Sequence, residues 1–111
     1  MQLIDQAGRF TPPGGAPNHF VEQLRVPDLS LGTYSVPAGG VDDQTPHTED
    51  EIYVVCSGRA RLVAGGATVD VAPGSVVHVP AGEQHQFIDV LEDLALLVVF
   101  APPYRSRAPV Q

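Results

Sequence analysis

Three residues of this chain have side chains that commonly bind divalent metals. His47 and Glu51 stand four apart in the stretch "PHTEDE", and His85 follows in "GSVVHVPAGEQHQF". Two imidazoles and one carboxylate, if folding brings them together, suit Fe, Mn, Ni or Zn and leave coordination positions open. Residues four apart lie on the same face of an extended strand, so His47 and Glu51 can act as a pair.

The glycines and prolines around these residues follow two regular spacings. The first runs from Gly39 through Thr45, Pro46, His47 and Glu51 to Gly58, and the second from Gly74 through Pro80, Ala81, Gly82 and His85 to Asp89. In order and spacing, the pair resembles the two motifs of the cupin family over Gly39 to Asp89. The resemblance implies a jelly-roll β-barrel, a cupin-like double-stranded β-helix, with one divalent metal inside.

Carried over position by position, the resemblance implies that His47, Glu51 and His85 are the metal ligands. Thr45 stands where the family has a further histidine, and a hydroxyl is a weak metal ligand. Gln44, one residue away, is a candidate fourth ligand if the segment before Pro46 is not regular strand. Asp89 replaces the family's usual asparagine. Whether Gln44 or Thr45 replaces the missing histidine stays open.

Other polar residues have weaker claims on the site. Tyr53 shares a strand face with Glu51 and is a candidate pocket residue, as are His78 and Arg61. If Arg61 faces the cavity, it favours a carboxylate-bearing ligand. The alternative is that Arg59 and Arg61 are a surface pair that only adds solubility. Glu49 is expected to be a solvated loop charge.

Short apolar runs separated by glycine and proline predict an all-β chain. The expected strands are residues 18–26, 29–36, 51–57, 76–79, 85–90 and 94–100, with a hairpin over 60–71 that turns at Gly65 and Gly66. No apolar pattern of helical period runs far enough to predict a helix. We expect one domain over residues 1–111, with its core at about 18–101 and loop-rich ends.

Two strands carry apolar residues on both faces. In "EIYVVC" both faces are largely apolar, and "LALLVVF" has no polar residue at all. Because an antiparallel strand with one wet face should alternate, we expect a second subunit to cover part of this surface, in a homodimer.

Composition excludes several classes of partner and chemistry. The net charge is −7, which disfavours nucleic acid and anionic membranes. All six basic residues are arginines, so lysine Schiff-base chemistry is excluded, and the single cysteine, Cys56, cannot form an intrachain disulfide. The chain shows no membrane-spanning apolar stretch and no leader pattern, so the expected location is cytoplasmic.

The reaction is not selected by the motifs, because the family they resemble includes enzymes and binding proteins. One hypothesis is a small metalloenzyme, such as a dioxygenase, isomerase or lyase, acting on a small oxygen-rich or carboxylate-bearing metabolite. A second is a non-catalytic module that binds or senses a small molecule. A third, a jelly roll with a decayed site, predicts no metal.

Overall fold

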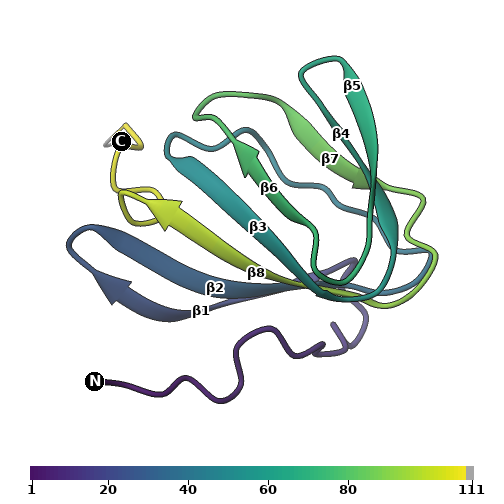
Figure 1. Ribbon diagram of the computed structural model, residues 1–111, viewed down its shortest axis with the longest axis horizontal. Helices are drawn as coiled ribbons and strands as arrows, with labels where there is room; N and C mark the ends of the chain where they lie inside the picture. The colour runs from purple at the N-terminus through teal and green to yellow at the C-terminus, as the bar shows by residue number, and fades with distance from the viewer. Residues whose placement is uncertain (110–111) are drawn as a thin grey trace.

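The computed structural model describes residues 1–109 and shows eight β-strands, with no helix in that range (Figure 1). The strands are β1 (His19–Val26), β2 (Leu29–Val36), β3 (Asp50–Ser57), β4 (Ala60–Ala64), β5 (Ala67–Val71), β6 (Val76–Val79), β7 (His85–Ile88) and β8 (Leu94–Ala101). No helix able to cross a membrane is found in the described part. The all-β prediction is confirmed.

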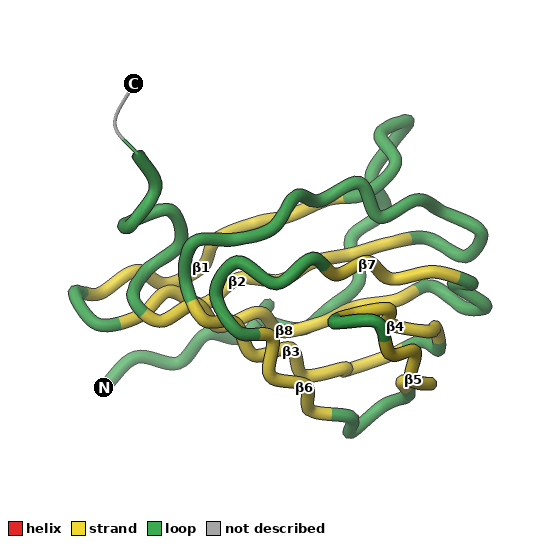
Figure 2. The backbone as a smooth tube through the Cα atoms, turned by 90° about the horizontal axis from the view of Figure 1, so that it is seen from above, coloured by secondary structure: helices red, strands yellow, loops and turns green. Residues whose placement is uncertain are grey.

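The strands form two antiparallel sheets, seen from above in Figure 2. The larger sheet has the order β1-β2-β8-β3-β6 and the smaller β5-β4-β7. Hydrogen bonding in the described residues does not join them into a closed barrel. Their inner faces share one apolar core that includes Tyr34, Leu62, Phe87 and Leu96, as in a two-layer β fold.

The local turn and strand signals predicted from sequence are present. Gly65 and Gly66 have φ of 57° and 79° and connect β4 to β5, with Ala64 paired to Ala67. These are the positive φ angles that a two-residue hairpin turn requires. The alternation expected in β3 is also observed, with Glu51, Tyr53 and Val55 buried on the inner face.

The outer face of β8 is covered in part by the chain's own N-terminal segment. The Gly8 amide donates to Thr33 Oγ1 at 2.9 Å, and the Thr11 amide to Ser35 Oγ at 3.1 Å. This contact places Gly8 against Cys56 and Leu97, on the outer sides of β3 and β8. Part of the two-sided apolar pattern therefore has an explanation within one chain. The homodimer stays a prediction.

Gly58, between β3 and β4, is required by both its conformation and its surroundings. Its φ is 87°, and a side-chain carbon there would overlap the Asp93 carbonyl oxygen and lie 2.7 Å from Leu94 Cα. Gly66, at φ 79°, has open space at the equivalent position. Comparing substitutions at the two glycines therefore separates the cost of a left-handed backbone from the cost of the steric overlap.

We expect Gly58→Ala to lower the free energy of unfolding in urea well beyond Gly66→Ala. Gly66→Ala should cost about 1–2 kcal/mol, from the left-handed backbone alone. Gly58→Ala should cost a further ~1–3 kcal/mol, because backbone atoms must move. Equal losses in the two variants would contradict the close packing at Gly58.

Candidate metal centre

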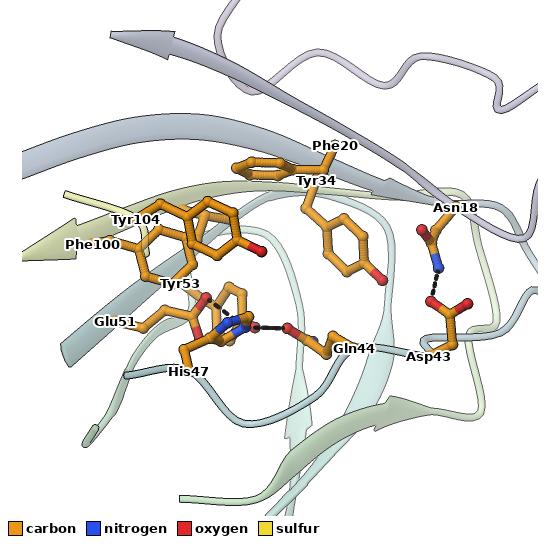
Figure 3. Close-up of a pocket in the computed structure, with 11 residues that line it drawn as sticks. Asn18, Phe20, Tyr34, Asp43, Gln44, His47, Glu51, Tyr53, Phe100 and Tyr104 are labelled. Atoms are coloured by element: carbon orange, nitrogen blue, oxygen red, sulfur yellow. Dashed lines mark hydrogen bonds and ion pairs between the residues drawn. The ribbon is translucent and has the colours of Figure 1, made fainter. Parts of the chain in front are cut away.

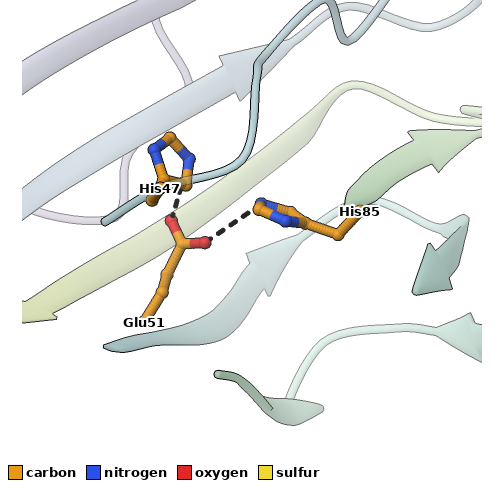
Figure 4. Close-up of side chains that lie close together, drawn as sticks. All are labelled: His47, Glu51 and His85. Carbon is orange, nitrogen blue, oxygen red and sulfur yellow. Dashed lines mark ion pairs between the residues drawn. The ribbon is translucent and has the colours of Figure 1, made fainter. Parts of the chain in front are cut away.

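His47, Glu51 and His85 converge at one point between the two sheets (Figure 4). Glu51 is the second residue of β3, His85 opens β7 in the opposite sheet, and His47 lies in the loop that leads into β3. One ligand atom from each residue lies within 4.8 Å of the others. The packing of β7 opposite β3 thus brings together residues that are far apart in sequence.

The Glu51 carboxylate is buried, and its Oε1 atom accepts no hydrogen bond. That oxygen lies 3.1 Å from His85 Nε2, and Oε2 lies 3.7 Å from His47 Nε2. A buried polar atom without a partner is costly and uncommon in native proteins. Glu51 Oε1 is therefore an unsatisfied acceptor that a bound cation would satisfy.

The orientation of His85 follows from its hydrogen bond to the backbone. Its Nδ1 lies 2.9 Å from the Glu83 carbonyl oxygen, which can only accept, so Nδ1 carries a proton. A neutral ring then directs the lone pair of Nε2 into the cluster, toward Glu51. An imidazole held in this way by a carbonyl is the usual arrangement around a metal-binding histidine.

Gln44 supplies a fourth candidate ligand atom, its side-chain oxygen, to the same point. Its Oε1 lies 2.9 Å from His47 Nε2 and 3.2 Å from His85 Nε2, and accepts a hydrogen bond from the Tyr53 hydroxyl at 2.9 Å. Its amide Nε2 donates to Asp42 Oδ2 at 2.6 Å. Because a carboxylate only accepts, Asp42 requires the NH₂ on its own side and the oxygen on the cluster side.

Asp42 is itself fixed by the fold. It is buried and accepts hydrogen bonds from the Tyr34 hydroxyl at 2.7 Å and the Phe87 amide at 2.8 Å. These contacts link β2, β7 and the loop that carries Gln44. Sequence reasoning missed Asp42, because its role depends on donors from two distant strands.

Burial and neighbouring charges set the proton affinities in the cluster. Burial lowers the pKa of His47, which favours its neutral, ligating form. Burial alone would also lower the pKa of His85, but the adjacent Glu51 carboxylate and the Glu83 carbonyl outweigh it and raise that pKa. Burial raises the pKa of Tyr53, so its hydroxyl stays protonated and remains a donor.

A family model described as "Cupin domain" matches residues 32–100, which hold the whole cluster. The chain belongs to the cupin family. It is 50% identical over 84 residues to Uncharacterized protein SCO3923 of Streptomyces coelicolor, covering 76% of this chain and 80% of the relative.

Solved structures share the cupin fold at low sequence identity. An uncharacterized conserved protein with a double-stranded β-helix domain from Klebsiella pneumoniae aligns at a TM-score of 0.76 and 18% identity, covering 92% of this cupin and 89% of the neighbour. The DMSP lyase DddQ from Ruegeria pomeroyi aligns at a TM-score of 0.72 and 20% identity, covering 90% of this cupin and 54% of the lyase. Such similarity establishes the fold and not a reaction.

The candidate residues named from sequence divide into two groups in this cupin. Tyr53 is buried beside the cluster, and Gln44 points into it. The remaining three lie outside: Thr45 and His78 are exposed and do not line the cavity beside the cluster, and Arg61 pairs with Asp70 at 3.2 Å and Asp89 at 3.7 Å on the protein surface. The case for a carboxylate-bearing ligand built on Arg61 therefore has no support in the geometry.

Glu49 was expected to be solvated, and that prediction is wrong. Its side chain is 1% exposed, and its two oxygens accept hydrogen bonds from the backbone amides of Arg105 at 2.8 Å and Arg107 at 3.0 Å. Burial alone would raise the pKa of Glu49, but these bonds and one from Thr48 outweigh it and hold that pKa below its usual value. Glu49 thereby anchors the C-terminal segment near the cluster.

The anchored segment places Tyr104 over the site. Its ring lies 5.7 Å from that of His47 and 4.8 Å from that of Phe100. The Tyr104 amide donates to Ser30 Oγ at 2.9 Å, and its carbonyl accepts from Arg25 at 3.0 Å. A segment expected to be loop-rich is thus part of the wall of the site.

We expect Glu49→Gln to lower the free energy of unfolding by about 1–3 kcal/mol. A carboxamide has one oxygen for two backbone N–H donors, so one of them is left unpaired in a buried position. Glu92→Gln is the control, because Glu92 is exposed and its ion pair with Arg59 is long, at 4.0 Å. Its free energy of unfolding should change by no more than about 0.5 kcal/mol. Similar urea denaturation curves for the two variants would contradict the anchor.

Proposed function

We propose that this cupin binds one divalent metal through His47, Glu51, His85 and the side-chain oxygen of Gln44. The observation that carries the proposal is the buried Glu51 oxygen that no donor satisfies, facing the His85 lone pair and the Gln44 oxygen. The Glu51 and Gln44 oxygens and the Nε2 atom of a neutral His85 repel one another unless a cation or a proton lies between them. Their nitrogen and oxygen chemistry fits Fe, Mn, Ni or Zn.

We propose further that the centre acts on a small oxygen-bearing metabolite. A bound metal would supply Lewis-acid polarisation of an oxygen on that molecule. The protein contributes orientation, since Asp42 and Glu83 hold Gln44 and His85 in their ligating positions. A metal-dependent dioxygenase, isomerase or lyase would each fit this arrangement.

The second candidate is a binding or sensing cupin without turnover. The hydrogen bonds at Gln44 favour it, because the Tyr53 hydroxyl and His47 satisfy the amide oxygen without any metal. A protonated His85 would complete that network. Elemental analysis of tag-free protein separates the candidates that need a metal from one that does not.

We expect metal content to collapse in His47→Ala and in His85→Ala and to persist in His78→Ala. His78 is the matched control because it is an exposed histidine on β6, outside the cluster. The measurement is the ratio of metal to protein by mass spectrometry after purification without a tag. Equal occupancy in all three variants would place the metal elsewhere.

We expect Gln44→Ala to weaken metal binding at least about tenfold, and Gln44→His to preserve it, because imidazole is the family's usual donor at this point. Thr45→His should have no effect, since Thr45 faces outward and the segment around it is not strand. Competition against a metal-binding dye measures each affinity. Tighter binding in Thr45→His with no loss in Gln44→Ala would assign the fourth position to residue 45.

A further inference from the structure

A cavity of about 160 Å³ opens beside the cluster (Figure 3). Gln44, His47 and Glu51 form its polar side. The opposite wall is aromatic and aliphatic, built by Phe20, Tyr34, Val98, Phe100 and Tyr104. A molecule in this cavity would therefore contact the cluster at one end and aromatic rings along the rest of its surface.

The aromatic wall is built by specific packing. Phe20 and Tyr104 meet edge to face at 5.7 Å. The Phe20 ring also lies over Gly32 on β2, where a side-chain carbon would come within 2.6 Å of it. These contacts hold the rings in place from β1, β2 and the C-terminal segment, so the cavity is largely formed before a ligand arrives.

Size restricts what the cavity can hold. An engineered cavity of about 150 Å³ with apolar walls binds benzene. The volume here accommodates one six-membered ring or a compact molecule of the same size, with a short substituent directed at the cluster. The second ring of a two-ring molecule would have to extend through the mouth into solvent or displace the walls.

Charge restricts the occupant further. Two of the lining residues are acidic, Asp43 and Glu51, and none is arginine or lysine. At the mouth, Asp43 accepts a hydrogen bond from Asn18 at 2.8 Å. Arg59 and Arg61, in contrast, pair with acids on the exterior. An anionic group on the ligand would find no cationic side chain in the cavity, and burying an unpaired charge is costly.

We propose that the cavity binds an uncharged, ring-sized molecule that presents a hydroxyl or carbonyl oxygen to the cluster. Phosphorylated compounds are disfavoured in the metal-free protein, where no arginine or lysine lines the cavity to balance their charge. The role of the oxygen rests on the proposed metal centre, whereas the fit of the ring depends only on the aromatic wall. The two ideas can therefore fail separately.

The test compares three probes that share a benzene ring: benzyl alcohol, phenyl phosphate and 2-naphthylmethanol. Each is titrated into ¹⁵N-labelled protein, both as purified and after metal removal with a chelator, and backbone amide shifts are followed by NMR. We expect benzyl alcohol to shift the amides of Phe20, Phe100 and Tyr104 in both forms. In the metal-free form, phenyl phosphate should bind at least about tenfold more weakly than benzyl alcohol, and 2-naphthylmethanol should bind more weakly than benzyl alcohol in both forms.

Two exposed neighbours on β1 provide matched variants. Phe20→Ala removes part of the wall and should weaken benzyl alcohol binding several-fold, while Val21→Ala, which is similarly exposed and does not line the cavity, should not. Phenyl phosphate binding to the metal-free form as tightly as benzyl alcohol would overturn the proposal, as would the absence of shifts with every probe. Benzyl alcohol binding to protein that contains no metal as purified would support it while contradicting the metal centre.

Discussion

A buried carboxylate oxygen without a hydrogen-bond donor is the constraint around which this site is built. Glu51 lies on the inner face of β3, where solvent cannot satisfy it, and the Nε2 atoms of His85 and His47 lie 3.1 Å and 3.7 Å from its oxygens. Such an arrangement persists only if the surroundings hold it firmly. The surroundings do so for two of the proposed ligands, since the Glu83 carbonyl orients His85 and the Asp42 carboxylate orients Gln44.

That support extends well beyond the residues that touch the cluster. Asp42 orients Gln44 and is held in turn by Tyr34 and by the Phe87 amide. Glu49 fixes the C-terminal segment, and this segment carries Tyr104 over His47. Two acids that lack any metal-binding role thus determine the shape of the site. Each is buried because it accepts backbone N–H groups, which lets a carboxylate remain inside the protein.

Local patterns predicted the strands, the Gly65-Gly66 hairpin and the inward face of β3, because these depend on alternation and turn chemistry. The outward position of Arg61 follows the same alternation, since its neighbour Leu62 is fully buried, but sequence alone left Arg61 open between the pocket and the surface. Burial of Glu49 was not readable, because its partners lie 56 and 58 residues away and are backbone amides of any residue type. The inward position of Gln44 depends on the irregular segment before Pro46. The sequence predicted Gln44 as a ligand only if that segment were not regular strand, and it could not show that it was not.

The position of β8 has a consequence for how the chain folds during synthesis. β8 is the last of the eight described strands to be made, yet it lies in the middle of the large sheet, between β2 and β3 (Figure 1). Until it emerges from the ribosome, β2 and β3 each present an unpaired edge, and such edges favour aggregation. Pairings so distant in sequence also form slowly. The large sheet can therefore be completed only after β8 has been synthesised.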